Sequence, residues 1–368
     1  MTRARDIANL GNNTTNLETL DTLYGDNVLT GRNLIINGAM TVDQRNGGSA
    51  LTVNTAAEFY AVDRFMGLGV ASDGVYTLQQ VTDAPDNFVN SIKATVTTAD
   101  ASIPTTGRYL IRHKLEGNTI SQLNLGSSVA QTFTLSFYVK SSLTGTFGGS
   151  VLNGAQDRSY PFTYTISSAN TWERKTVTIA GDTTGTWPTD NTKAMQIGWS
   201  LGVGSDYLNT AGAWVGSQEW GATGETAVIA TLNATWQITG VQLEVGETAT
   251  PFEHRSYGDE LARCQRYYLK IFSSASRMAG RPGFSQTNQA NRVGFEFPME
   301  MRSAPTYIAS GVTLWDGVGT YNSPPLTAAR MDNNGFDADY TVTGITTSRP
   351  VWYFFDASSD YLEFSAEL

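Results

Sequence analysis

The sequence predicts an all-β protein whose main body is a β-sandwich of the jelly-roll type. Charged residues make up only 16% of the 368 residues, whereas Gly occurs 36 times and Thr, Ser and Asn are abundant. This composition is typical of turn-rich β proteins with uncharged polar surfaces. Short segments alternate apolar and polar residues, and no long helical spacing appears over about 200 residues of the main body. The length predicts two or three domains.

The first segment, residues 1–31, differs from the rest. Its apolar residues stand among polar residues and Gly and Asn breakers, with a spacing that is only partly helical and too short for a coiled coil. We expect a short helical or extended stem that attaches the chain to a larger assembly. The apolar residues are Ile7, Leu10, Leu17, Leu20 and Leu23.

Residues 32–255 are predicted to form the jelly-roll body. Thr132–Lys140 places Phe133 and Phe137 on one face and Thr134 and Lys140 on the other, which is the pattern of a half-buried strand. Further short strands are expected at residues 175–179 and 195–204. The basic stretch Arg108–Lys114 also alternates, so we interpret its charges as the solvent face of a strand.

The end of the body contains a strand that changes phase. Trp236 and Ile238 share one parity and Val241 shares the other, so the sequence predicts a β-bulge at Gly240. Pro251 then ends the ladder pairing. A short helix is expected to start at Ser256 or Asp259. The single cysteine, Cys264, excludes an intrachain disulfide and is interpreted as a small buried side chain.

Residues 256–368 are predicted to form a smaller β-rich tip domain. Its last segment alternates up to the chain end, which is typical of a terminus held in a sheet. Type I′ hairpin turns are expected at Asp316-Gly317 and Asn334-Gly335. The expected strands are residues 292–301, 312–317, 338–345, 350–357 and 361–368.

Charge and motif content argue against several classes of protein. A formal net charge of −10 disfavours nucleic acid as a main partner. The first ten residues lack the continuous apolar run of a secretion signal, and no run approaches the roughly 18 apolar residues of a membrane span. His113 and His254 have no further ligand residues at suitable spacing. We therefore expect no metal, no cofactor and no insertion into membranes.

A glycoside hydrolase is the enzymatic alternative, because it needs only two carboxylates at a suitable separation. Asp206, Glu219 and Glu225 lie in one aromatic-rich region and are the candidates. With 34 acidic residues in the chain, some proximity is expected by chance. The sequence contains no nucleophile-elbow motif, and we predict that the protein is not an enzyme.

Aromatic residues supply the candidate binding site. An exposed Trp or Tyr offers a flat apolar face to a sugar ring, while neighbouring polar groups bond its hydroxyls. Trp199 alternates with Ile197 and Leu201 and is expected to point inward. Trp214 and Trp220 stand in a Gly-rich loop and are predicted to be exposed. The candidate ligand-binding residues are Tyr207, Trp214, Trp220, Trp315 and Tyr321.

Several segments resemble a known family. "GRNLIINGAMTVDQRNG" (31–47), "YAVDRF" (60–65) and "ITGVQLEVGETATPFEHRSYGDELARCQRYY" (238–268) are similar to tail fibre and receptor-binding proteins of tailed bacteriophages. "FPMEMRSAPT" (297–306) and the final "FSAEL" extend the likeness to about residues 31–368, and "TRARDIANL" is similar to phage fibre N-termini. The family has no agreed binding residues to transfer.

The resemblance implies a virion structural protein. It implies a homotrimer, attachment to other tail or virion proteins through the N-terminus, and a host cell-surface polysaccharide as the ligand. It also implies a location in the tail appendage of the particle, outside the host after lysis. A head decoration or fibre-connecting protein without host contact is the alternative from a different class, and a polysaccharide depolymerase is the third.

Overall fold

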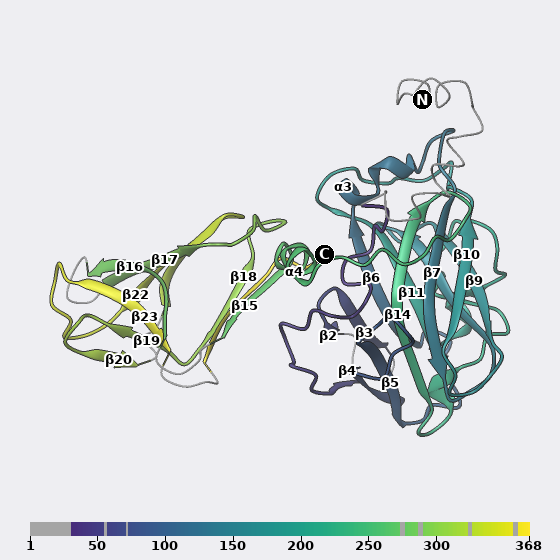
Figure 1. Ribbon diagram of the computed structural model, residues 1–368, viewed down its shortest axis with the longest axis horizontal. Coiled ribbons are helices and arrows are strands. Elements are labelled where there is room, and N and C mark those ends of the chain that lie inside the picture. The colour runs from purple at the N-terminus through teal and green to yellow at the C-terminus, as the bar shows by residue number, and fades with distance from the viewer. Residues whose placement is uncertain are drawn as a thin grey trace, which may run out of the picture.

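The computed structural model describes residues 31–54, 57–70, 73–272, 277–285, 290–322, 326–355 and 360–368. Two β-rich parts lie end to end with one short helix between them (Figure 1). The expected N-terminal stem lies outside the described residues except for Gly31. The prediction of an all-β protein with a sandwich body is confirmed, while the domain boundaries stay predictions.

The body consists of two six-stranded antiparallel sheets packed face to face, and the chain crosses repeatedly from one to the other (Figure 1). One sheet, called sheet A here, has the order β1 (Leu51–Val53), β4 (Val75–Val81), β5 (Ser91–Thr98), β14 (Thr235–Val245), β7 (Phe133–Ser141), β10 (Glu173–Ile179). Sheet B has the order β2 (Phe59–Val62), β3 (Phe65–Val70), β6 (Arg108–Glu116), β11 (Lys193–Val203), β8 (Gly145–Asn153), β9 (Ser159–Ile166).

Shorter elements complete the body. The two-stranded pair β12 (Leu208–Asn209) and β13 (Gly221–Ala222) lies in the loop that follows β11. Helix α3 spans Gly117–Ile120, and 3-10 turns occupy Ser121–Leu123, Ser205–Tyr207 and Val228–Ala230.

The core between the two sheets follows the alternation seen in the sequence. Phe133 and Phe137 of β7 are fully buried, as is Trp199 of β11 between Ile197 and Leu201. The expected inward direction of Trp199 is therefore confirmed. Its ring meets that of Phe137 edge-on, with centroids 5.8 Å apart, a favoured aromatic geometry.

The predicted bulge in β14 is present. Thr239 pairs with Tyr138 and Gln242 with Ser136, so Gly240 and Val241 together oppose a single residue of β7. Gly240 has φ +60°, and Trp236 and Val241 are both fully buried on either side of the change in phase. The extra residue thus restores the inward direction of the second half of the strand.

The solvent-face interpretation of the basic stretch is wrong. Arg112, His113 and Lys114 of β6 are all buried, with side chains on both faces of a central strand. Arg112 and Lys114 both bond the Glu58 carboxylate, at 3.1 and 2.7 Å. Neighbouring segments therefore cover the outer face of sheet B, on which Arg112 and Lys114 lie. The alternation of a single strand cannot predict such a covering layer.

The tip contains a seven-stranded and a three-stranded antiparallel sheet around a core that includes Leu314, Phe336 and Phe364. The seven-stranded order is β20 (Thr320–Asn322), β19 (Val312–Trp315), β23 (Pro350–Phe355), β16 (Arg277–Ser285), β17 (Ala290–Glu296), β22 (Gly335–Thr341), β21 (Leu326–Met331). The three-stranded order is β15 (Tyr268–Phe272), β24 (Tyr361–Ser365), β18 (Thr306–Ser310).

Both expected tip hairpins form, but not with the predicted turn residues. Trp315 pairs with Thr320, so the central residues of the first turn are 317 and 318 instead of 316 and 317. Met331 pairs with Phe336, so those of the second turn are 333 and 334 instead of 334 and 335. Gly317 has φ +87°, whereas Asn334 and Gly335 do not adopt positive φ. The carboxylates of Asp316 and Asp332 accept the turn N–H groups, which favours this alternative turn geometry.

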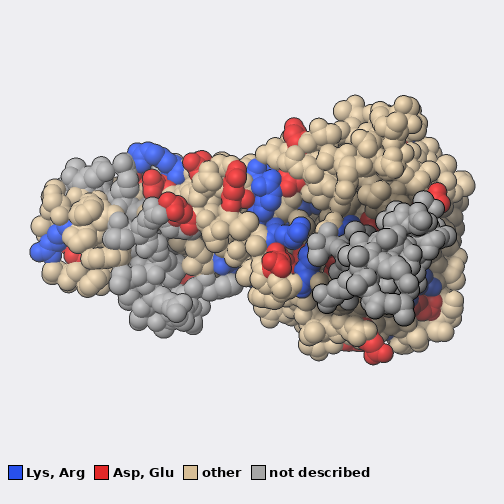
Figure 2. All heavy atoms as spheres, turned by 45° about the horizontal axis from the view of Figure 1, so that its top comes forward, with Lys and Arg blue, Asp and Glu red and all other residues tan. Residues whose placement is uncertain are grey.

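Helix α4 (Tyr257–Gln265) joins body and tip. It starts where the sequence predicts, because the Ser256 hydroxyl accepts a hydrogen bond from the Asp259 N–H at 3.2 Å. Cys264 is buried, as expected, in a small cluster with Ile36 and Tyr267. Charged side chains gather where the two parts meet, while most of the same face is uncharged (Figure 2).

Candidate functional site

Trp220 is not exposed, which corrects the prediction. Only 1% of the residue is accessible to solvent. Its indole packs against the outer face of sheet B, where a Cβ at Gly198 would be 2.8 Å from the ring. The Arg112 guanidinium lies 5.3 Å from the ring centroid. The glycine of β11 makes room for the indole, and the loop after β11 thereby covers the sheet.

Trp214 and Tyr207, from the same loop, are half-buried. The Trp214 indole donates to the Ala180 carbonyl at 2.7 Å and packs edge-on against Tyr160 and Trp187, with centroids 5.4 and 5.5 Å away. The Arg108 guanidinium lies 4.4 Å from the Tyr207 ring centroid. These contacts anchor the loop to the body.

Trp315 and Tyr321 lie in the tip and face opposite sides of its larger sheet, because Tyr321 pairs with Leu314 rather than with Trp315. Tyr321 packs against the tip core. Trp315 is half-buried beside Trp352, with centroids 5.1 Å apart. The five predicted residues thus lie in the loop after β11 and in the tip, with Trp220 buried, and they do not form one site.

A different group of side chains forms an aromatic cleft on the outer side of sheet A. The cleft has a volume of about 660 Å³. Phe88 lies at its centre, with ring centroids 5.3 Å from Tyr138, 5.0 Å from Phe252 and 5.2 Å from His254. We use the name aromatic cleft for the surface lined by Asn87, Phe88, Tyr138, Arg174, Pro251, Phe252 and His254.

The bulge in β14 makes this cleft possible. A Cβ at Gly240 would lie 2.7 Å from Cζ of Phe88 and 2.9 Å from Cδ2 of Tyr138, closer than atoms pack. The positive φ of Gly240 is also unfavourable for residues with a side chain. The Phe88 N–H donates to the Pro85 carbonyl at 3.1 Å, which fixes the turn that presents the ring.

The rim of the cleft is polar. Arg174 and His254 are exposed, and the Arg174 guanidinium donates to the Thr250 carbonyl. Asn87 adopts φ +69°, a left-handed conformation that Asn tolerates better than most residues. Flat apolar rings beside hydrogen-bonding groups can hold the C–H face and the hydroxyls of a sugar.

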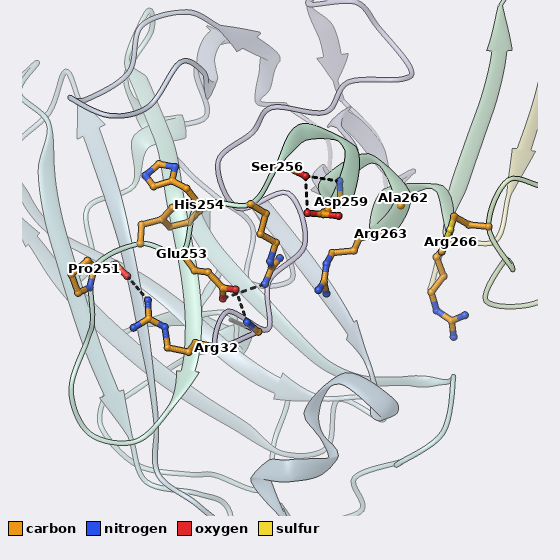
Figure 3. Close-up of a pocket in the computed structure, with 13 residues that line it drawn as sticks. Arg32, Pro251, Glu253, His254, Ser256, Asp259, Ala262, Arg263 and Arg266 are labelled. Atoms are coloured by element: carbon orange, nitrogen blue, oxygen red, sulfur yellow. Dashed lines mark hydrogen bonds and ion pairs between the residues drawn. The ribbon is translucent and has the colours of Figure 1, made fainter. Parts of the chain in front are cut away.

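A second cavity, the arginine pocket, adjoins the aromatic cleft at the segment 251–254. Figure 3 draws the residues that line it. The volume of this pocket is about 700 Å³. Figure 3 shows the Arg263 and Arg266 guanidinium groups extending from helix α4 toward the same side as Arg32, while the His254 imidazole points the other way. Pro251, Phe252 and His254 line both cavities. The arginine pocket is lined by these three residues and by Gly31, Arg32, Glu253, Arg255, Ser256, Asp259, Ala262, Arg263, Arg266 and Met299.

The acidic groups of the arginine pocket are engaged by its own wall. The Glu253 carboxylate accepts the N–H groups of Gly31 and Asn33 at 2.6 and 2.7 Å. Partial burial raises its pKa, but these two hydrogen bonds and the charges of Arg255 and Arg32 outweigh burial and lower the pKa overall. The Ser256 hydroxyl donates to Asp259 at 2.6 Å as part of the helix cap.

The three candidate catalytic carboxylates do not converge on a cavity. Glu225 is half-buried, with its carboxylate packed against Gly148 and Gly221, and loss of hydration raises its pKa to about 7 despite hydrogen bonds from Ser200 and the Ala222 N–H. Glu219 is also buried, whereas Asp206 is exposed. In the described part of the chain no three His, Cys, Asp or Glu side chains group as a metal site.

Phe88, Tyr138, Phe252 and His254 were missed by sequence reasoning. They come from three segments far apart in the chain, and their meeting depends on the register of β7 and β14. The one available signal was the expected bulge at Gly240, because a bulge beside aromatic residues redirects side chains. The crowding of Trp residues in the loop after β11 was the stronger but misleading signal.

Together the fold and the cleft define a β-sandwich with an aromatic groove on one sheet. No protein-family model matches the chain, and no curated protein matches it. Similar solved structures include the enzymatically active domain of tailspike protein 4 of bacteriophage CBA120, at 13% identity and TM-score 0.31, covering 59% of this chain and 22% of that chain.

Two others are carbohydrate-binding modules. The family 11 module of a cellulosomal cellulase of Clostridium thermocellum is 12% identical, with a TM-score of 0.27, and covers 57% of this chain and all of that one (100%). The xylan-binding domain of Paenibacillus barcinonensis is 9% identical, with a TM-score of 0.25, covering 56% and 99%. At these values the similarities assign no function to the chain.

Proposed function

We propose that this chain is a non-enzymatic receptor-binding protein of a tailed bacteriophage, which attaches the particle to a polysaccharide on the host surface through the aromatic cleft. The cleft carries the proposal, because four aromatic rings from three segments converge on an open face of the body. The proposed site differs from the five aromatic residues expected from the sequence.

The virion assignment is supported by the likeness of residues 31–47, 60–65 and 238–268 to tail fibre proteins. Two of these segments have a structural role in the body and the junction. Glu253 accepts hydrogen bonds from the backbone of Gly31 and Asn33, and β14 carries the bulge beneath the cleft. We propose a homotrimer on the tail, so that several weak sugar contacts act together.

Adsorption of the purified chain to host cells tests the proposal. We expect Phe88→Ala and Phe252→Ala each to weaken binding at least about tenfold, because each removes a flat apolar surface from the sugar-binding face. Binding is measured by sedimentation of labelled protein with cells and by protection of the cells from infection.

Phe284→Ala is the matched control. Phe284 is an exposed aromatic residue of the tip and lies outside the cleft, so its removal should leave adsorption unchanged. Equal adsorption by Phe88→Ala and the unchanged protein would contradict the site. Labelling of this chain on the capsid rather than the tail would favour a head decoration protein, and release of reducing ends from the polysaccharide would favour a depolymerase.

A further inference from the structure

The aromatic cleft and the arginine pocket share one wall. Pro251, Phe252 and His254 line both, so an extended ligand that crosses this segment lies over Phe88 on one side and meets arginine side chains on the other. We call the two cavities together the groove. The combined volumes, about 660 and 700 Å³, suit several sugar units better than one. The chemistry of the arginine end should therefore select the ligand.

Two arginines of the pocket are committed to the fold. The Arg255 guanidinium donates to the Ile35 carbonyl at 2.9 Å and lies 3.6 Å from the Glu260 carboxylate. Arg266 forms two hydrogen bonds with Glu116, at 2.8 and 3.1 Å. Neither guanidinium is free to serve as the main anchor of a ligand.

The other two arginines of the pocket, Arg32 and Arg263, and Arg174 of the aromatic cleft form no ion pair with a carboxylate in the described part of the chain. Arg263 and Arg174 are exposed. Arg32 is half-buried, its charge helps to lower the pKa of Glu253, and it donates a long hydrogen bond, 3.4 Å, to the Pro251 carbonyl. Arg174 bonds a carbonyl rather than a carboxylate. The chain as a whole has a net charge of −10. The groove therefore carries cationic side chains without a direct ion pair in a protein that is acidic as a whole.

The guanidinium group matches a carboxylate in a planar, two-bond geometry, and such charge-assisted bonds are stronger than neutral ones. A uronic acid unit has a carboxylate on the ring edge and C–H groups on its face. In a chain of such units, sugar rings would pack on Phe88 in the aromatic cleft, and carboxylates would pair with Arg32, Arg174 or Arg263.

We infer that the groove takes an anionic polysaccharide that bears carboxylates, with sugar rings on the aromatic cleft and carboxylates at Arg32, Arg174 and Arg263. This inference rests on the proposed glycan-binding function and adds the class of glycan. The basis is the shared wall between an aromatic cavity and one with unpaired arginines.

Affinity electrophoresis of the full chain through gels that contain a polysaccharide tests the inference. The probes are polygalacturonate, alginate and hyaluronan, each paired with its carboxyl-reduced, neutral counterpart, and dextran sulfate as a sulfated polyanion. We expect at least one carboxylated member to be bound about tenfold or more tightly than its neutral counterpart. The preference should weaken at high salt, because exposed charge interactions are screened.

The variants are Arg32→Gln, Arg174→Gln and Arg263→Gln, with Arg330→Gln as the matched control. Arg330 lies in the tip with 56% of its side chain exposed, so its loss changes net charge equally but not the groove. Each groove variant should bind the carboxylated probe several-fold more weakly and leave the neutral counterpart unchanged. Thermal unfolding of each variant verifies that the fold persists.

The outcomes separate the two proposals. Equal binding of carboxylated and neutral members, lost in Phe88→Ala, would overturn the anionic ligand and keep glycan binding. Stronger binding of dextran sulfate than of every carboxylated probe would overturn the choice of carboxylates. An equal effect of Arg330→Gln would show general charge attraction and overturn the site. Binding unaffected by Phe88→Ala would contradict the proposed function itself.

Discussion

At the scale of single residues, the clearest physical feature is a half-buried carboxyl group, Glu225, that forms no ion pair within the described part of the chain. Burial raises the pKa of Glu225 from the ordinary 4.5 to about 7, although Ser200 and the Ala222 N–H donate to it. The folded state therefore holds this proton more tightly than the unfolded chain. The contribution of Glu225 to the free energy of unfolding is therefore most favourable below about pH 4.5 and falls as pH rises to about 7.

Glu225→Gln should remove this penalty. The amide can accept the Ala222 N–H and donate to Ser200, and it carries no charge at any pH. We expect the variant to be more stable than the unchanged protein at pH 8, by up to roughly 3 kcal/mol, with little difference at pH 4.5. Denaturant unfolding at the two pH values measures it.

Asp63 makes the comparison between variant and unchanged protein necessary. Burial also raises the pKa of Asp63 to about 7, so the unchanged protein keeps a pH dependence of the same sign from a second group. Only the difference between the two proteins reports on Glu225. Glu247→Gln, at an exposed carboxylate, should show no such difference. An equal gain at both pH values would contradict the explanation.

At the scale of elements, the bulge of β14 links the sheet to the cleft. Gly240→Ala places a Cβ at a residue with φ +60° and within 2.9 Å of both Phe88 and Tyr138. We expect a loss of about 2 kcal/mol or more in the free energy of unfolding, and weaker glycan binding as Phe88 is displaced.

Gly47→Ala is the control for backbone conformation alone. Gly47 has φ +55°, but a Cβ there would meet no atom within 4 Å. Its cost should be about 1 kcal/mol, with binding unchanged. If the two variants lose equal stability, the contact with Phe88 and Tyr138 has no role, and denaturant unfolding would reveal this directly.

Features that depend on residues adjacent in the sequence could be predicted. Features that depend on a distant loop covering a sheet could not. The core-facing side of β7, the cap at Ser256 and the phase change at Gly240 follow from neighbouring residues, and the structure confirms each. The opposite side of β7 was expected to face solvent, but Thr134 and Ser136 are buried. The burial of Arg112 and Trp220 depends on a loop folding back over sheet B. The aromatic cleft likewise depends on register between distant segments, which no single stretch encodes.

At the scale of the whole molecule, one carboxylate connects the chain end to the body. Glu367 forms ion pairs with Arg45 at 2.6 Å and with Arg64, whose side chain is only 2% exposed. The Arg64 guanidinium also lies 3.6 Å from the Tyr267 ring centroid. Lys114 of β6 bonds the Leu368 carbonyl. The tip is therefore attached to the body by charged side chains that are largely buried.

Glu367→Gln tests this attachment. The change keeps the shape of the side chain but leaves the buried Arg64 without its carboxylate, and breaking a buried pair in this way costs about 3–5 kcal/mol. We expect the tip to separate from the body at lower temperature, seen as a split or broadened calorimetric transition and as faster proteolysis at residues 251–257. Glu247→Gln removes an exposed carboxylate of the body and should leave both readings unchanged. A single transition at the original temperature in Glu367→Gln would mean that apolar packing around Cys264 and Tyr267, rather than Glu367, holds the two parts together.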